Sequence, residues 1–88
     1  MAGQTAVKKA NAGGSRSAAL AMIEEVIELG SITPFEDCEI KLHSGLVCVF
    51  VRVEGAGWGC IGSVGTKDMN QSADQLNHLL GFARSALD

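Results

Sequence analysis

The run from Leu46 to Val53 is apolar at every position except Arg52, so a strand formed by it presents apolar side chains on both faces. A strand with one face in water alternates between apolar and polar residues, because successive side chains point to opposite faces. A continuous apolar run is typical of a strand that is covered on both sides. The chain has only 88 residues, and the patterns below predict two helices, enough to cover one face of a small sheet. The sequence therefore raises the question of what covers the other face.

A length of 88 residues corresponds to one small domain, and an apolar content of 47% argues against general disorder. The longest uninterrupted apolar runs, residues 18–23 and 46–51, have six residues each, whereas a membrane-spanning helix needs about 20. The first residues, Met1 to Gln4, show no apolar segment of a secretory signal. We therefore expect a cytoplasmic protein, in a cell or in an infected host, with no membrane association.

Charge is distributed unevenly along the chain. Residues 1–17 contain three basic and no acidic residues, whereas residues 18–88 contain four basic and ten acidic residues, a net charge of −6. An extended phosphate-binding surface needs clustered Lys and Arg, so the acidic body disfavours one. The same charge suits a basic protein partner.

The domain organisation follows from the helix signals. Residues 1–14 are expected to form a flexible basic arm, because Gly13-Gly14 would break a helix and no periodic apolar residues are present. Residues 15–88 are expected to form a single α+β domain. Its first helix is predicted over Arg16–Leu29, with Ser15 as the N-cap and Gly30 as the terminating residue. Its apolar stripe is formed by Leu20, Ile23 and Ile27, flanked by Met22, Val26 and Leu29.

Three strands are predicted in the middle of the chain, joined by the two-residue turns Ser44-Gly45 and Gly55-Ala56. The strands are Asp37–His43, Leu46–Glu54 and Gly57–Val64. The segment from Ser31 to Glu36, with the only proline, is predicted to be a loop.

The second helix is predicted over Lys67–Leu87, with Thr66 as the N-cap. Its apolar stripe is Met69, Ala73, Leu76, Leu80, Ala83 and Leu87. The expected fold is thus α+β, a helix, a three-stranded antiparallel meander and a helix (αβββα), with both helices packed on one face of the sheet.

Two-residue turns fix the register of the meander and so assign residues to its faces. Under the helices we expect Ile40 opposite Val49, Val51 opposite Cys60, and Val53 opposite Trp58. The other face is predicted to carry an apolar patch with a charged rim, which is typical of an interface. This predicted interface consists of Leu46, Cys48, Phe50, Ile61, Glu39 and Lys41.

A homodimer is the occupant of this face that the sequence favours. Phe50 lies at the centre of the patch, where a large ring buries the most area, and a two-fold axis would set the patch against itself. Glu39 and Lys41 would then pair across the axis. Two alternatives stay open: one helix covers each face, or the N-terminal arm folds over the patch.

No motif in the sequence predicts catalysis, a metal or a cofactor. The stretch Gly57–Gly62 matches the dinucleotide fingerprint G-x-G-x-x-G, but it falls on a strand and not between a strand and a helix. Cys38, Cys48 and Cys60 lack metal-ligand spacing and are expected to be buried thiols. His43 and Cys48 share a face, yet nothing nearby would activate a nucleophile. We therefore predict a protein that is not an enzyme.

The order helix, three-stranded meander, helix, together with the glycine-rich third strand, resembles the double-stranded-RNA-binding domain over most of residues 18–87. That resemblance implies RNA binding, although the stretch from Thr66 to Ser72 holds Lys67 as its only basic residue where the family has a basic cluster. The leading prediction is a small protein-interaction module, of the kind found among phage-type inhibitors or regulators of host machinery. The alternative is a nucleic-acid-binding protein that uses the basic arm.

Overall fold

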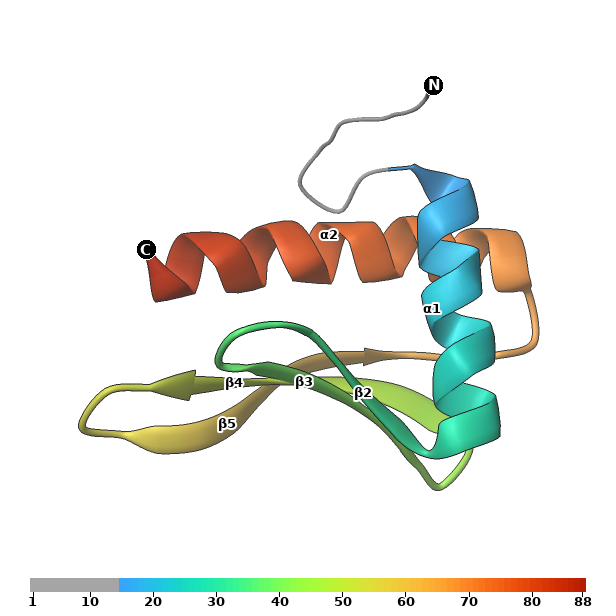
Figure 1. Cartoon of the computed structure of the whole chain (residues 1–88). Coiled ribbons are helices and arrows are strands. Elements are labelled where there is room, and N and C mark those ends of the chain that lie inside the picture. The colour runs from blue at the N-terminus through green and yellow to red at the C-terminus, as the bar shows by residue number, and fades with distance from the viewer. Residues whose placement is uncertain (1–14) are drawn as a thin grey trace.

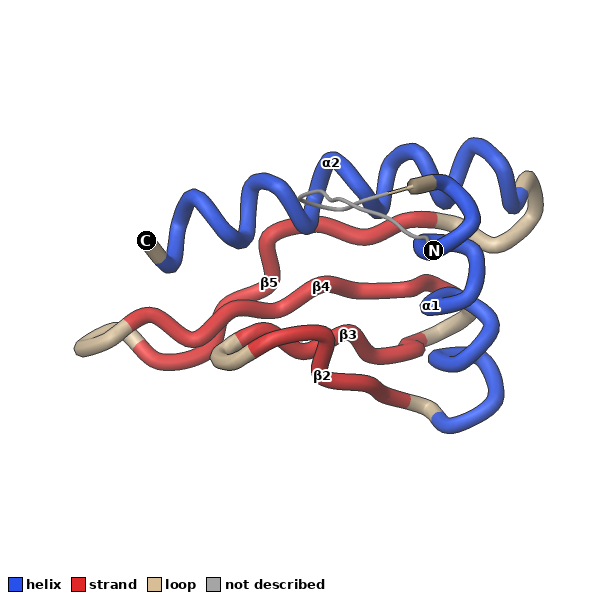
Figure 2. The backbone as a smooth tube through the Cα atoms, turned by 45° about the horizontal axis from the view of Figure 1, so that its top comes forward, coloured by secondary structure: helices blue, strands red, loops and turns tan. Residues whose placement is uncertain are grey.

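A computed structural model describes residues 15–88, and the predicted basic arm, residues 1–14, lies outside the described part. The elements follow in the order α1 (Arg16–Leu29), β2 (Ser31–Phe35), β3 (Cys38–His43), β4 (Leu46–Val53), β5 (Gly57–Val64) and α2 (Met69–Leu87). The strands form one antiparallel sheet in the order β2-β3-β4-β5 (Figure 2), and both helices lie on one side of it (Figure 1). The predicted α+β class and arrangement are confirmed, but the sheet has four strands and not three.

The additional strand is β2, in the segment that was predicted to be a loop. Ser31 pairs with Lys41 and Ile32 pairs with Ile40, after which the register is irregular as far as Phe35. Pro34 lies in this irregular part, and a proline is tolerated there because β2 is an edge strand. The loop prediction was wrong because Pro34 was taken to interrupt the strand, whereas a proline is also compatible with a strand at the edge of a sheet.

Both helices begin at side-chain caps. The Ser15 hydroxyl accepts a hydrogen bond from the backbone N–H of Ala18 at 3.1 Å, as predicted for α1. The second helix begins two residues later than predicted. Its N-cap is Asp68, whose carboxylate accepts from the N–H of Gln71 at 3.2 Å, and Thr66 instead donates to the carbonyl oxygen of Gly45.

Polar contacts join the start of α1 to the middle of α2. Arg16 donates two hydrogen bonds to Asp74, Nε to Oδ1 at 3.0 Å and Nη2 to Oδ2 at 2.7 Å. These hydrogen bonds, followed by the attraction of the two charges, lower the pKa of Asp74. Asn77 donates through Nδ2 to the carbonyl oxygen of Ser15 at 3.3 Å. This flank of α2 is therefore occupied by contacts to α1.

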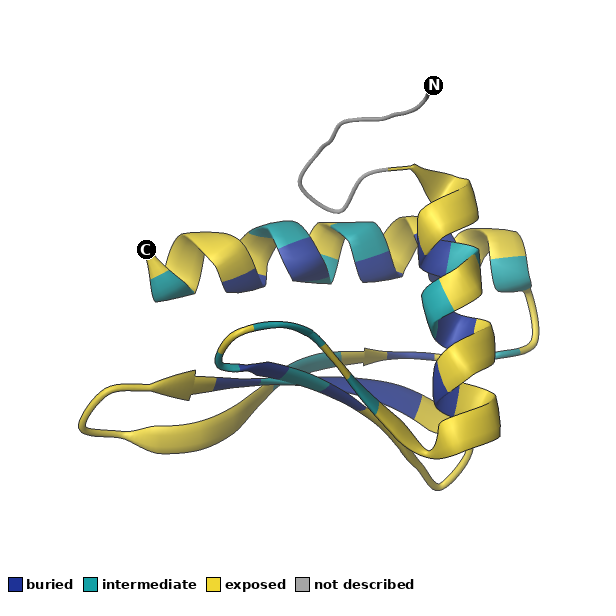
Figure 3. Cartoon of the chain, viewed as in Figure 1, coloured by how far each residue is buried: buried dark blue, intermediate teal, exposed yellow. Residues whose placement is uncertain are grey.

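The core lies between the sheet and the two helices, as the buried residues in Figure 3 show. The stripe predicted for α2 is confirmed, with Leu76 and Leu80 buried at its centre. The stripe predicted for α1 is rotated, because Ile23 is buried as expected but Ile27 and Leu29 are exposed, the latter to 64%. The buried residues of α1 are Ala19, Ile23 and Val26.

The β4–β5 hairpin differs from the prediction by one residue. Val53 pairs with Gly57, so the loop holds three residues, Glu54 to Ala56, and not two. The N–H of Ala56 donates to the carbonyl oxygen of Val53 at 2.9 Å, and Gly57 at the end of the loop has a φ of +83°. A three-residue hairpin loop commonly ends with a glycine in this left-handed region.

This shift moves Trp58 and Cys60 to the face opposite the one predicted, because a slip of one residue reverses every side chain. Trp58 pairs with Arg52 and Cys60 pairs with Phe50, so the prediction that Trp58 lies under the helices was wrong. A bulge then inserts Ile61 as an extra residue, and from Gly62 to Val64 the predicted register holds again. Ile61, which was expected on the open face, packs against the core.

The position of Leu80 yields a direct test of the core. Leu80→Ala should reduce the free energy of unfolding by about 2–5 kcal/mol, because it leaves a cavity beneath α2. Leu29→Ala is the matched control, and it should change stability by less than about 0.5 kcal/mol, as expected for an exposed side chain. Denaturant titration of dilute protein measures both. Equal effects of the two substitutions would contradict this packing of the helices.

Two glycines of β5 provide a second test, because the space around them differs. A Cβ built at Gly62 would lie 2.6 Å from Leu79 Cδ2, whereas a Cβ at Gly59 meets nothing within 4 Å. Gly59→Ala should stabilise the protein by about 0.4–1 kcal/mol, because it restricts the unfolded chain. Gly62→Ala restricts the unfolded chain equally but must displace the end of the Leu79 side chain, so this variant should be less stable than Gly59→Ala. Thermal unfolding compares them, and a Gly62→Ala variant at least as stable as Gly59→Ala would contradict the close approach of α2 to β5.

Candidate interaction surface on the open sheet face

The face of the sheet opposite the helices is called the outer face here. Within the described residues neither helix covers it (Figure 1). The strand register places on it Glu39, Lys41, His43, Leu46, Cys48, Phe50, Arg52, Trp58, Cys60 and Ser63. Trp58 is 51% exposed, Leu46 is also exposed, and Phe50 is partly buried. Large apolar side chains on an open face are the feature that marks interaction surfaces.

Five of the six residues of the predicted interface lie on this face. They are Leu46, Cys48, Phe50, Glu39 and Lys41. The sixth, Ile61, is displaced by the bulge, and Trp58 and Cys60 enter the surface in its place. The signal that could have revealed them is Gly57, since a glycine directly after Gly55-Ala56 fits a three-residue loop as well as a strand residue.

Each large ring on the outer face has a cation beside it. Lys41 Nζ lies 5.9 Å from the centre of the Phe50 ring, and the guanidinium carbon of Arg52 lies 5.9 Å from the centre of the Trp58 ring. These distances are within the range in which a cation is attracted to an aromatic ring. The contacts hold the side chains of Lys41 and Arg52 against the rings, so the outer face presents charged and apolar groups side by side.

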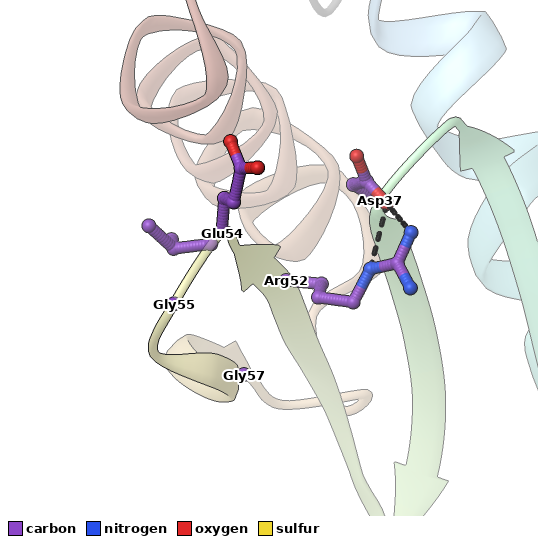
Figure 4. Close-up of a pocket in the computed structure, with 6 residues that line it drawn as sticks. Asp37, Arg52, Glu54, Gly55 and Gly57 are labelled. Atoms are coloured by element: carbon purple, nitrogen blue, oxygen red, sulfur yellow. Dashed lines mark hydrogen bonds and ion pairs between the residues drawn. The ribbon is translucent and has the colours of Figure 1, made fainter.

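Both cations are also paired with an acid of the same chain. Lys41 Nζ lies 3.7 Å from Glu39 Oε1, and Arg52 Nε donates to Asp37 Oδ1 at 2.9 Å (Figure 4). The Arg52–Asp37 contact lies at the end of the sheet, beside a hollow of about 430 Å³ at the loop end of the β4–β5 hairpin. Exposed ion pairs of this kind stabilise a fold only slightly. Their larger effect is to leave the outer face without net charge.

A second hollow, of about 320 Å³, lies on the outer face itself. It is lined by Glu39, Lys41, Phe50, Trp58, Gly59 and Cys60. An apolar side chain of a partner would find here two aromatic walls and a polar rim, which is the arrangement expected for an anchor residue at an interface.

The three cysteines differ in burial, contrary to the expectation of three buried thiols. Cys38 is fully buried, and burial raises its pKa to about 11. Cys48 is 8% exposed, and burial, with a smaller effect from Cys60, raises its pKa. Cys60 is exposed, with its Sγ 3.6 Å from the carbonyl oxygen of Gly62. Only Cys60 is thus presented openly on the outer face.

The described part of the chain holds no group of three or more His, Cys, Asp or Glu side chains that could bind a metal ion. Neither α1 nor α2 is long and apolar enough to cross a membrane. In comparisons with known proteins, no family model, no curated protein and no solved structure matched the chain significantly. The candidate site is therefore defined by the geometry of the outer face alone.

The thiols yield a third prediction. At about pH 8, a thiol-specific reagent should modify Cys60 fastest and Cys38 only after unfolding, because the thiolate is the reactive form and Cys38 is both buried and raised in pKa. Cys60→Ser should remove the fast phase. Since Cys38 titrates near 9.0 when unfolded and near 11 when folded, its contribution to stability is lost as the pH rises through that interval. A fast phase that survives in Cys60→Ser would contradict this assignment.

Proposed function

We propose that the protein is a non-enzymatic interaction module that binds a basic protein partner on its outer face. The observation that carries the proposal is the exposed indole of Trp58 beside Phe50 on a face that neither helix covers. Tryptophan is among the residues that contribute most binding energy at protein interfaces. A small module of this kind acts by occupying the surface of another macromolecule, as an inhibitor or regulator of host machinery does.

The charge distribution supports a basic partner. The outer face with its rim holds two acids and two bases, Asp37, Glu39, Lys41 and Arg52, so the net charge of −6 on residues 18–88 comes from the rest of the body. The net negative charge of the body attracts a basic protein over a long range, and the outer face, which has no net charge, can then be desolvated at a lower cost than a charged one. Three of the acids, Glu24, Glu25 and Glu28, lie on α1 on the other side of the sheet, so they contribute to the long-range attraction and not to the contact itself.

A homodimer formed by two outer faces is less well supported than the binding of a basic protein partner. Glu39 and Lys41 were predicted to pair across the two-fold axis, but they already lie 3.7 Å apart within one chain. The contact that would have fixed the register of the dimer is thus satisfied without a second copy.

Nucleic acid is the other class of ligand that an open aromatic face suggests. Single-stranded nucleic acids stack their bases on exposed rings while Lys and Arg contact the phosphates. Phe50 and Trp58 would supply the rings, but Lys41 and Arg52 are held by Glu39 and Asp37. The acidic body adds to the repulsion of phosphates. The structure therefore favours a protein partner.

The fourth prediction tests the outer face with variants that alter exposed positions. Trp58→Glu should weaken capture of the partner from extracts of the native host by at least about tenfold, because it places an unpaired charge at the anchor. Leu29→Glu, an equally drastic change at an exposed residue of α1, should leave capture unchanged. Circular dichroism should show both variants folded.

Two outcomes would overturn the proposal. One is a partner that is retained by Trp58→Glu and Phe50→Glu as well as by the unmodified protein. The other is tight, salt-sensitive binding of RNA or DNA in an electrophoretic shift assay at low and moderate salt, since this would assign the face to nucleic acid.

A further inference from the structure

A second surface, distinct from the outer face, lies along the side of the molecule where β5 ends the sheet. We propose that two copies of this chain associate there, with the free edge of β5 and the adjacent flank of α2 forming a two-fold symmetric interface. This dimer does not rest on the proposed function, because it uses neither the Trp58 indole nor the Phe50 ring.

The two edges of the sheet are built differently. The edge strand β2 contains Pro34 and has an irregular register, both of which blunt an edge against further pairing. The edge strand β5 has eight residues, from Gly57 to Val64, with no proline and no charged residue. Charged side chains are a usual protection of an exposed edge, and β5 has none. The bulge at Ile61 interrupts this edge at one point, and among the described residues no other strand pairs with its free side.

The flank of α2 above β5 is likewise uncharged. Leu79 marks this flank, because its side chain lies against Gly62 of β5. Residues three, four and seven positions away share a side of a helix with it, and these are Gln75, Phe82 and Ala86. Phe82 is 59% exposed, which is unusual for a ring of this size on a helix that already has a complete buried stripe.

The opposite flank of α2 is charged and occupied. Asp74 pairs with Arg16, Asn77 donates to Ser15, and the guanidinium carbon of Arg84 lies 4.2 Å from the centre of the Phe35 ring. Within residues 15–88, the α1 side of the helix is thus occupied by polar contacts, whereas the β5 side carries the exposed ring of Phe82. Figure 2 shows that α2 runs beside β5. The uncharged edge of β5 and the flank of α2 that carries the exposed Phe82 therefore lie on the same side of the molecule.

A second copy is the occupant that the charges favour. In a two-fold arrangement each residue near the axis lies close to its own counterpart, so two acidic chains approach most easily where the residues near the axis are uncharged. The β5 side has no charged side chain in the strand or on the helix flank. The strand comprises Gly57–Val64, and the flank of α2 comprises Gln75, Leu79, Phe82 and Ala86. Antiparallel pairing of β5 with β5 of the other copy would join two sheets of four strands, and Phe82 would pack on the α2 helix of that copy. A specific interface needs roughly 600 Å² or more per copy, which the strand edge and the helix flank would supply together.

The dimer would leave the outer face accessible. Joining the two sheets edge to edge puts both outer faces on the same side of one continuous sheet, with Trp58 of each copy near the shared edge. A partner bound there would contact two copies of the anchor site at once, which raises the apparent affinity without any new kind of contact.

Sedimentation equilibrium of the full chain, from micromolar to submillimolar concentration, tests the proposal. The unmodified protein should approach twice its mass of 9.2 kDa. Phe82→Glu should raise the dissociation constant of the dimer by at least about tenfold, because it sets two like charges against each other. Leu29→Glu changes an equally exposed apolar residue on α1 and should leave the dissociation constant unchanged.

Hydrogen exchange of the unmodified protein is a second measurement that needs no variant. Amides of β5 should become more protected as the concentration rises, whereas those of β2 should not change. The proposal is overturned by a monomer at every concentration, by a dimer that Phe82→Glu leaves intact, by equal loss in Phe82→Glu and Leu29→Glu, or by concentration-dependent protection confined to strands other than β5. A dimer broken by Phe50→Glu alone would instead assign self-association to the outer face.

Discussion

The burial of one row of valines on β4 determines where every other element lies. Val47, Val49 and Val51 point toward the helices and are almost fully buried, so this strand must lie inside the sheet, with a neighbour on each side. The two helices together close this single apolar layer, with Ile23 and Leu80 among the largest side chains against it. A chain of 88 residues has no material left for a second layer within its described part. The openness of the outer face is therefore a consequence of how the core is built.

The fold could be predicted from the sequence wherever one strong local signal acted alone. The limits of α1 followed from Ser15 and Gly30, and the pairing of β3 with β4 followed from the turn Ser44-Gly45. The predictions failed where the same short stretch of sequence was equally compatible with two local structures. Pro34 is compatible with a loop or with an edge strand, and only the presence of β3 as a neighbour selects the strand. Thr66 and Asp68 are both good N-caps, and the contact of Thr66 with Gly45 decides between them.

The candidate site was predicted in part for the same reason. Phe50, Leu46 and Cys48 belong to β4, whose register was certain, and all three are on the outer face. Trp58 and Ile61 belong to β5, where the loop before the strand and the bulge within it each shift the register by one residue. Neither shift can be inferred from alternation, because β5 contains three glycines and presents no clear polar and apolar sides. For this reason Trp58, the anchor of the proposed interface, was predicted to lie in the core.

The loop of the β4–β5 hairpin and the bulge at Ile61 each shift the register of β5 by one residue, and the two shifts cancel. The loop adds one residue before the strand, and the bulge absorbs one residue within it, so Val64 returns to the core while only the segment between them is inverted. The face that residues 57–60 present therefore depends on the loop and the bulge together. A two-residue loop followed by a strand without a bulge would turn these residues over while Val64 kept its place, so the exposure of the Trp58 indole is set by the backbone path of one hairpin and not by the core.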